Sequence, residues 1–510
     1  MDFFSNLQGM QKYFNVYLML FVTFAAFSIL GHHLEMEGFF HDGYLYSAMS
    51  ANVLRNPQIF PMNPSPFHFP DAAIHPPLTF LIQAFLFFLF GTSTLVARFS
   101  GVIWSVFSVG VMCYFLLKEN KPSWAINTTL CLLLTIPFLR KTRFPNTDIL
   151  LTVLYTLGVW GVYYLEKFKQ NRKKFNLMMV LFSVMIGLGL LTKGPNAIIF
   201  YICLFFYFLY KKSLKSLFSL VSLISLVFIP LSIFSLWPLA LYKSGAIEQF
   251  SKYIEFQVIG TAIKSRGKAS WELWVYFHFL FFYCMPWGLV SLINLGKNIF
   301  YKHLYKDDEK SKDLYVLFLI GTLSVLVPFS FVKFKYSHYI MPIYPVFAGF
   351  NGYFLTQVFK KFQSQSKVNV IFVLLVVGVN FVFNILPLPI NKEKTRDKEL
   401  YFLSTYLKNT NQDVTAIFNV NSVYSFYNLI NYASFYHPKI HVYVNNLENS
   451  YNLWLSLDKN RQDSCVFIVS REDELTLKRV LNENKYIYYP IYSEKNKSLK
   501  IYFVVNKNSI

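Results

Sequence analysis

The 510-residue sequence has few charged residues and few cysteines. Asp, Glu, Lys and Arg make up 15% of it, against about a quarter in soluble domains. The five cysteines show neither a disulfide framework nor the spacing of a metal site. Acidic residues are the scarcest charges, with 27 Asp and Glu against 48 Lys and Arg. These shortages exclude an ordinary soluble domain and a small disulfide-stabilised module.

Apolar residues are abundant instead. The sequence is 54% hydrophobic and 19% aromatic, and its mean hydropathy is +0.37. The excess of lysine lies in short loops between apolar runs, a pattern that orients a membrane protein rather than one that binds nucleic acid. The first run, Tyr13 to Leu30, is too long for a signal-peptide core and is expected to remain as a span. We therefore predict a polytopic α-helical membrane protein.

Eleven membrane spans are expected, and a count of thirteen would keep the same orientation. One of them is a long run that Thr192-Lys193-Gly194-Pro195 interrupts with a charge and two helix breakers, so it is divided into two short spans. The stretch 77–90 is interpreted as an interfacial helix. The predicted spans are 13–30, 96–117, 124–139, 149–165, 176–191, 197–210, 217–241, 272–295, 314–332, 339–357 and 368–388.

Loop charge predicts the orientation. With the N-terminus in the cytoplasm, the basic loops that begin at Lys167, Lys211, Lys297 and Lys360 all fall on the cytoplasmic side. The remaining loops then face the outside. They are 31–95, 140–148, 192–196, 242–271 and 333–338, and the tail from 389 lies on the same side.

The pattern of apolar residues changes in the tail, residues 389–510. Residues 1–388 and 389–510 are therefore predicted to be two domains. The apolar runs of the tail have the length of strands, and segments of helical period such as Ser422–Ala433 and Glu472–Asn484 separate them. This alternation predicts a small α/β domain with a partly parallel sheet. The expected strands are Val414–Val420, Ile440–Val444, Cys465–Ser470, Tyr486–Ile491 and Leu499–Val505. The tail has no glycine-rich phosphate loop and no nucleophile elbow, so a lid or docking role is favoured over catalysis.

The unusual polar residues gather on the outer side. A carboxylate can orient or deprotonate an acceptor there, while Lys and Arg hold phosphate charge. This arrangement suits a reaction on an anionic lipid. The candidates are Asp42, Tyr46, His75, Arg143, Asp148, Lys193, Lys335, His338 and Tyr339, with a further basic cluster at Lys264–Lys268.

Each candidate also has a structural interpretation. Asp42 and Asp148 each stand where a helix begins, so either could be an N-cap. Lys193 could extend from a helix end to water. Lys335 and His338 lie in a tyrosine-rich segment of the kind that anchors proteins at the membrane surface.

A metal site is the less favoured interpretation of one further group. His32, His33 and His41 lie near Glu35 and Glu37. They lack tight ligand spacing, and loop histidines are usually just solvated. No metal ligand is therefore assigned, and a divalent metal stays only an alternative.

Six short motifs occur in order along residues 30–360. Together they resemble the bacterial GT-C glycosyltransferases of the aminoarabinose-transferase and protein-O-mannosyltransferase-like superfamily. Gly187-Leu188-Gly189-Leu190-Leu191-Thr192-Lys193-Gly194-Pro195 is the most specific match. The others are Asp42-Gly43-Tyr44-Leu45-Tyr46, His75-Pro76-Pro77-Leu78, Arg143-Phe144-Pro145-Asn146-Thr147-Asp148, Pro286-Trp287 and Lys335-Tyr336-Ser337-His338-Tyr339-Ile340-Met341-Pro342.

The resemblance implies an inverting transfer from a polyprenyl-phosphate-linked sugar, such as an undecaprenyl phosphate donor, at the periplasmic face of the inner membrane. It implies that Asp42 activates the acceptor and that Asp148 assists. It also implies that Arg143, Lys193 and Lys335 bind the donor phosphate, with His75 and Tyr46 beside the substrate. The implied acceptor is lipid A or another envelope glycan or protein.

Some positions depart from that pattern. Position 43 is Gly where many relatives have a second acid, position 45 is Leu where lipid A transferases tend to have Arg, and His75 replaces a frequent Lys. These departures leave the sugar and the acceptor open, and a protein acceptor remains an alternative. A transporter is the alternative from another class, but the sequence shows no internal repeat and its charges gather at one face.

Overall fold

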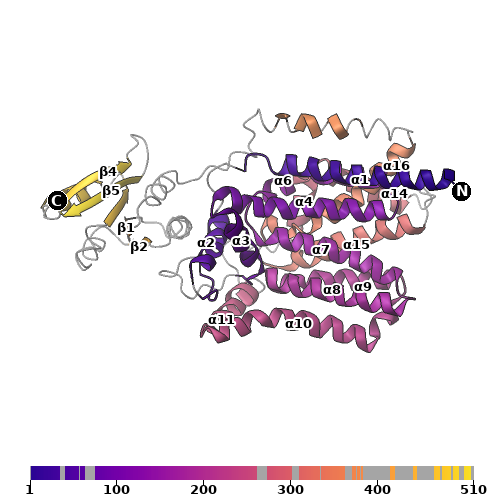
Figure 1. The fold of residues 1–510 in the computed structure, drawn as a ribbon, viewed down its shortest axis with the longest axis horizontal. Coiled ribbons are helices and arrows are strands. Elements are labelled where there is room, and N and C mark those ends of the chain that lie inside the picture. The colour runs from indigo at the N-terminus through magenta and orange to yellow at the C-terminus, as the bar shows by residue number, and fades with distance from the viewer. Residues whose placement is uncertain are drawn as a thin grey trace. The chain divides into compact units, whose positions relative to one another are not determined.

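A computed structural model describes the fold of the chain (Figure 1). The described residues are 2–34, 41–56, 58–63, 75–260, 273–300, 309–333, 335–361, 370, 372–374, 376–379, 381–382, 414–419, 440–444, 465–470, 474–483, 486–492 and 499–506.

The chain forms two compact units. The first consists of Met1–Glu35, Ile74–Thr79 and Leu95–Lys392, and the second of Met36–Ala73, Phe80–Thr94 and Glu393–Ile510. The domain boundary predicted between residues 388 and 389 stays a prediction.

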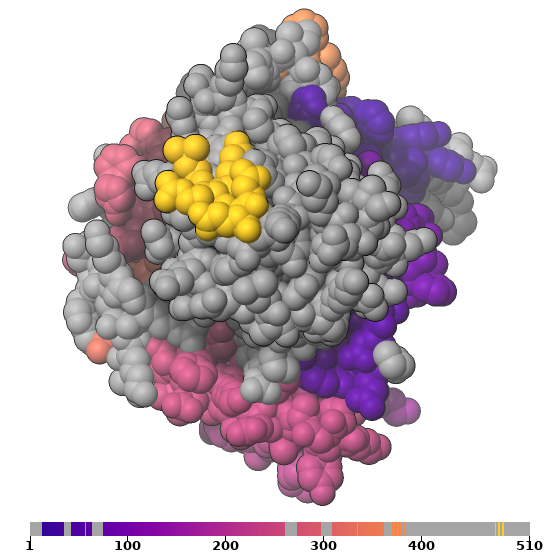
Figure 2. All heavy atoms as spheres, turned by 90° about the vertical axis from the view of Figure 1, so that its left-hand side faces the viewer, coloured from indigo at the N-terminus to yellow at the C-terminus, as the bar shows by residue number. Residues whose placement is uncertain are grey.

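The first unit is helical. It contains α1 (Asp2–Leu30), α4 (Thr94–Lys118), α5 (Pro122–Leu133), α6 (Ile136–Thr142), α7 (Thr147–Lys167), α8 (Arg172–Lys193), α9 (Ile198–Tyr210), α10 (Leu220–Lys243), α11 (Glu248–Tyr253), α13 (Val275–Tyr283), α14 (Trp287–Phe300), α15 (Glu309–Phe331) and α16 (Ile343–Lys361). Shorter pieces are η1 (Gly194–Ala197), η2 (Leu214–Phe218), the π-helix η3 (Ile254–Ile259) and η4 (Ser337–Ile340). In the space-filling view, the pink segment of α10 and α11 lies at the surface of the face shown (Figure 2).

Among the described residues, six helical stretches are long and apolar enough to cross a membrane, or eight if each of two bent pairs is one span. One of the six is the interrupted run Arg172–Tyr210, which contains both α8 and α9. The predicted spans 124–139 and 272–295 are these bent pairs, with kinks of 70° and 110°. Most of 368–388 lies outside the described residues. The chain is thus a polytopic helical protein as predicted, and the count of eleven spans stays a prediction.

The interruption at Thr192–Pro195 reverses the chain, as the sequence predicts. The rings of Phe182 in α8 and Phe200 in α9 are 6.2 Å apart. In one continuous helix they would be about 27 Å apart, at 1.5 Å per residue. α8 and α9 are therefore two antiparallel segments.

Ion pairs show which loops share an end of the helical unit. Lys167 after α7 pairs with Glu119 after α4, and Lys211 after α9 pairs with Asp313 in α15. These contacts gather basic loops at one end. At the other end, Asp148 in α7 pairs with Lys193. These pairs agree with part of the loop grouping predicted from charge, whereas the full grouping and the membrane side that each end faces stay predictions.

The second unit contains two helices and a sheet. α2 (His41–Arg55) packs on α3 (Leu78–Phe90) through a hydrogen bond from Ser50 to Gln83 at 2.8 Å. With 13 residues, α3 is only about 20 Å long, too short to cross a ~30 Å hydrocarbon core. This length agrees with the interfacial interpretation.

The sheet of the tail matches the sequence prediction closely. Its strands are β1 (Val414–Asn419), β2 (Ile440–Val444), β3 (Cys465–Ser470), β4 (Tyr486–Tyr492) and β5 (Leu499–Asn506), in the order β2-β1-β3-β5-β4. β1 is parallel to β2 and β3, and β5 is antiparallel to β3 and β4. The sheet is therefore partly parallel, as predicted. α22 (Glu474–Glu483) matches the second expected helix, while 422–433 lies outside the described residues.

Candidate functional site

A buried ion pair lies where α7 begins and α8 ends. Asp148 is in the first turn of α7, Lys193 is the last residue of α8, and the Lys193 ammonium donates to the Asp148 carboxylate. The two residues are 3% and 8% exposed. Charges this deeply buried are found in proteins chiefly as pairs. The pair therefore places a buried polar group at this end of the helical unit, between the start of α7 and the end of α8.

The capping role considered for Asp148 is wrong. The side chain of Asn146 accepts a hydrogen bond from the backbone N–H of Ile149 at 3.0 Å, so Asn146 is the N-cap of α7. The Asp148 carboxylate lies one residue inside the helix and binds Lys193 instead.

Lys193 is held inside the protein rather than extended to water. Its ammonium lies 4.7 Å from the centre of the Tyr339 ring, within the range of a cation–π contact. Gly194 follows with φ +58° and ends α8. Only glycine adopts this conformation readily, so the Lys-Gly-Pro sequence ends the helix and turns the chain directly after the charge.

The segment from Lys335 to Tyr339 stacks its rings next to this pair. The rings of Tyr336 and His338 are parallel within 16° at 5.1 Å, and Tyr339 packs edge-on against His338 at 4.9 Å. Burial lowers the pKa of His338 to about 4, and Lys193 and Lys141 also lower it against the opposing effect of Asp148. His338 is thus neutral at pH 7. Lys335 donates to the backbone oxygen of Val332 at 2.7 Å.

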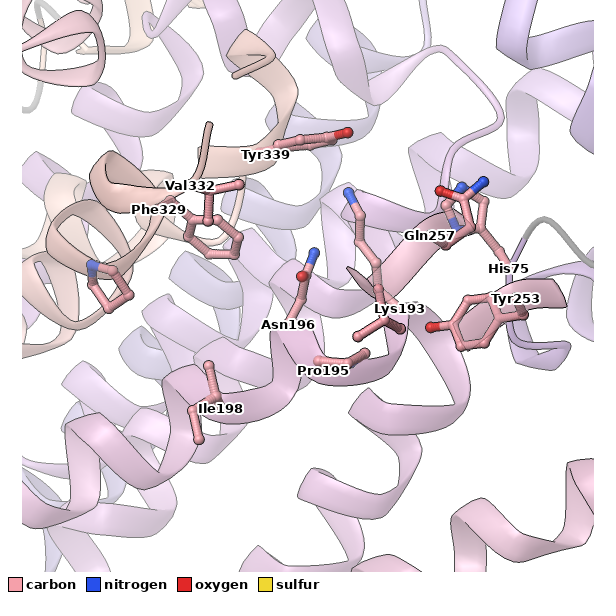
Figure 3. Close-up of a pocket in the computed structure, with 12 residues that line it drawn as sticks. His75, Lys193, Pro195, Asn196, Ile198, Tyr253, Gln257, Phe329, Val332 and Tyr339 are labelled. Carbon is pink, nitrogen blue, oxygen red and sulfur yellow. The ribbon is translucent and has the colours of Figure 1, made fainter. Parts of the chain in front are cut away.

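A cavity of about 230 Å³ opens beside Lys193 (Figure 3). One part of its wall is polar and the rest is apolar. The polar lining residues are His75, Lys193, Asn196, Tyr253, Gln257 and Tyr339, and the apolar ones are Pro195, Ile198, Val258, Pro328, Phe329 and Val332. Three predicted site residues, His75, Lys193 and Tyr339, therefore share one cavity.

Arg143 does not line this cavity. It is 2% exposed, and its guanidinium donates to the ring Nε2 of His32 at 3.0 Å and to the His32 carbonyl oxygen at 3.2 Å. Arg98 in turn reaches the carbonyl oxygen of Arg143 at 3.5 Å. In this structure Arg143 connects the end of α1 to the segment before α7, and its role toward a phosphate stays a prediction.

Asp42 and Tyr46 lie in α2, which belongs to the second unit. Asp42 is in the first turn and partly exposed. Tyr46 is buried, with its ring 5.6 Å from that of Phe80. Their predicted roles in catalysis and substrate binding stay predictions.

Metal ligands do not cluster in the part of the chain that the structure describes, where no group of three His, Cys, Asp or Glu side chains could hold an ion. Glu35 and Glu37 lie outside that part. The ring of His32 packs edge-on against that of His33 at 5.5 Å.

Three polar residues of the cavity wall did not emerge from the sequence. Asn196 could have been found, because it follows Lys193-Gly194-Pro195 directly. Tyr253 and Gln257 lie in the segment 242–271, which the sequence predicts to be a loop and which carries no recognisable motif. The basic cluster at Lys264–Lys268 falls outside the described residues.

Comparison with protein families gives a match to the family described as dolichyl-phosphate-mannose-protein mannosyltransferase over residues 74–237. An uncharacterized protein of Aquifex aeolicus is 24% identical over 302 residues. That match covers 57% of this chain and 55% of the relative, so the chain spans about half the length of that relative.

Solved structures resemble the chain over nearly all its length. ArnT from Cupriavidus metallidurans bound to undecaprenyl phosphate gives a TM-score of 0.66 at 14% identity, covering 96% of this chain and 97% of that one. The archaeal oligosaccharyltransferase AglB from Archaeoglobus fulgidus gives 0.55 at 12% identity, with coverages of 98% and 75%. Identities this low establish the fold, and it is the fold that the ordered motifs predict. The chain therefore shares its fold with ArnT and with the oligosaccharyltransferase AglB.

Proposed function

We propose that this protein is a glycosyltransferase that moves a sugar from a polyprenyl-phosphate donor to an acceptor of the bacterial envelope. One observation carries the proposal: Lys193, whose ammonium is paired with the buried Asp148, lies in the polar wall of a cavity whose remaining wall is apolar. Such a cavity suits an anionic headgroup attached to a hydrocarbon chain. The phosphate-bearing lipid named for ArnT and the dolichyl phosphate named for the matching family support the same class of donor.

The charge balance of the cavity fits the leaving group. A sugar-linked polyprenyl phosphate carries one negative charge, and its phosphate gains a second as the sugar leaves. A preorganised ammonium in a water-poor site stabilises such developing charge strongly. Lys193 is the cation in this position, and Asp148 keeps it oriented while no donor is bound.

In the proposed reaction, an acceptor hydroxyl oxygen attacks the anomeric carbon of the donor sugar. The bond from that carbon to the phosphate oxygen breaks, and its electron pair leaves with the polyprenyl phosphate. Asp42 accepts the hydroxyl proton, and the anomeric configuration inverts. The role of Asp42 rests on its sequence motif.

We propose lipid A or lipopolysaccharide as the acceptor and the periplasmic face of the inner membrane as the location. The tail after the last span favours a lipid acceptor, because it is similar to the extra external domain of the aminoarabinose-type transferases. A protein acceptor is the alternative within the same superfamily.

The test compares lipid A by mass spectrometry from a deletion strain that expresses wild type, Asp42→Asn or the exposed control Glu248→Gln. We expect an added sugar mass with wild type and with the control, and none with Asp42→Asn. Equal addition with Asp42→Asn would overturn its role. The absence of any added mass with wild type would exclude lipid A as acceptor.

Orientation has its own test. Lys243 and Lys212 are exposed and lie at opposite ends of the helical unit. In a cysteine-free background, Lys243→Cys should react with an impermeant thiol reagent added to whole cells, and Lys212→Cys only after lysis. The reverse pattern would place the cavity on the cytoplasmic side and contradict the proposal.

A further inference from the structure

The side chain of Tyr253 lines the cavity beside Lys193, and its hydroxyl makes no hydrogen bond to a described residue. The residue as a whole is 2% exposed. The hydroxyl of a tyrosine whose ring is buried usually finds a hydrogen-bond partner. A ligand in this cavity can supply that partner (Figure 3).

The position of this hydroxyl is set by packing on both sides. The Tyr253 ring lies 4.9 Å from the ring of Trp237 in α10, inclined by 72°. Its hydroxyl rests on Gly194, where the Cβ of any larger residue would lie only 1.9 Å from the oxygen. Since Gly194 directly follows Lys193, the tyrosine hydroxyl is fixed beside the turn that carries the ammonium.

The π-helix η3 completes the wall on which Tyr253 lies. Tyr253, Gln257 and Val258 all line the cavity, at spacings of four and five residues. In an α-helix the fifth residue points about 140° away from the first, at 3.6 residues per turn. The wider i→i+5 turn of a π-helix brings it back over the first residue. The π-helix thus explains how all three residues face the same cavity.

We propose that Tyr253 binds the donor, its hydroxyl donating a hydrogen bond to a phosphate oxygen that Lys193 also contacts. This inference rests on the proposed function and names a further binding residue for the same site. Burial raises the pKa of Tyr253, so the hydroxyl keeps its proton at neutral pH and acts as a donor. Hydrogen bonds to charged acceptors are the stronger kind.

The test uses Tyr253→Phe, which removes only the hydroxyl oxygen. The purified protein in lipid nanodiscs is titrated with undecaprenyl phosphate and, separately, with undecaprenol, and its thermal unfolding is recorded without ligand. We expect the affinity for the phosphate to fall about tenfold or more while that for undecaprenol stays unchanged. Thermal stability should not fall, because the variant removes a hydroxyl that makes no hydrogen bond to a described residue.

Tyr201→Phe is the matched control. Its hydroxyl donates to the Leu226 carbonyl oxygen at 2.6 Å, away from the cavity, so this variant should lose stability and keep its affinity for the phosphate. Lys193→Met tests the proposed function itself. If Lys193→Met weakens phosphate binding and Tyr253→Phe does not, the role of Tyr253 is overturned and the proposed function stands. If wild type does not prefer the phosphate to undecaprenol, the proposed function fails.

Discussion

The guanidinium of Arg143 fixes the tautomer of His32. Arg143 donates to the His32 Nε2 at 3.0 Å, and because a guanidinium can only donate, Nε2 must be the acceptor. The proton is therefore on Nδ1, which donates to the Ile29 carbonyl oxygen at 2.6 Å. A neutral histidine thus joins the end of α1 to the segment that precedes α7.

Replacing His32 by Leu should destabilise the protein by about 1–3 kcal/mol, because a buried guanidinium loses an acceptor. His32→Gln, which retains an acceptor oxygen, should lose less. Thermal or denaturant unfolding in detergent measures both. Equal losses for the two variants would mean that packing, and not the hydrogen bond, explains the effect.

Acid should weaken the fold through His338. Its pKa is about 4 in the folded protein and ordinarily 6.5, so between these values the unfolded chain binds more protons than the folded one. The stability contributed by neutral His338 is therefore complete above about pH 6.5 and is lost as the pH falls toward 4. Because the ring is partly exposed, we expect about 1–2 kcal/mol rather than the full value of the shift.

The measurement is the unfolding temperature of wild type and His338→Gln between pH 4 and 7.5. Wild type should lose more stability than the variant on acidification. Parallel curves for the two proteins would contradict the assignment.

The sequence predicted local patterns well and contacts between distant segments only in part. All five strands of the tail were predicted to within two residues, because each is a short apolar run between polar segments. The reversal of chain direction at Lys193-Gly194-Pro195 could also be predicted, since two helix breakers follow a charged residue. The kinks of 70° and 110° were not predicted, because apolar composition alone does not distinguish a bent pair from a straight span.

For the candidate site, too, the sequence indicated which residues lie in the same region but not which of them make contact. Loop charge indicated that Asp148, Lys193 and Tyr339 share one end of the helical unit, but not that they touch. Arg143 was expected at the donor phosphate because it is a cation in the correct loop, whereas its bond to His32 depends on the fold. Tyr253 lies in a loop without a motif, and only packing against Gly194 and Trp237 singles it out.

We expect the ionised carboxylate of Glu119 to stabilise the opposite end of the helical unit. Its carboxylate accepts hydrogen bonds from Tyr163, Tyr164 and Lys167. Burial would raise its pKa, but these bonds outweigh burial and lower it. The ionised form therefore stabilises the fold above the ordinary pKa of about 4.5, and this stability is lost as the pH falls through the lowered value.

Glu119→Gln should accordingly cost about 1–3 kcal/mol of unfolding free energy at pH 7, and less at pH 4. The control is Glu166→Gln, which breaks a pair with Lys169 in which the carboxylate is more exposed than that of Glu119, and it should cost less than about 1 kcal/mol. A pH-independent cost for Glu119→Gln, or an equal cost for the control, would contradict this account.

We expect substitutions of Asp148 and Lys193 to be coupled in their effects on the free energy of unfolding. Their effects on the affinity for undecaprenyl phosphate should differ. Removing one partner of a buried pair leaves an uncompensated charge and costs about 3–5 kcal/mol. Asp148→Asn and Lys193→Met should therefore each destabilise the protein, while the double variant should recover much of the loss. A double-mutant cycle on unfolding free energies measures this coupling.

Ligand binding separates the two roles. Asp148→Asn removes the anion that competes with a phosphate for Lys193, so its affinity for undecaprenyl phosphate should equal or exceed that of wild type. Lys193→Met should lose that affinity, and so should the double variant despite its recovered stability. If Asp148→Asn bound the phosphate as weakly as Lys193→Met, Asp148 would contact the ligand itself rather than serve as the counterion that orients Lys193.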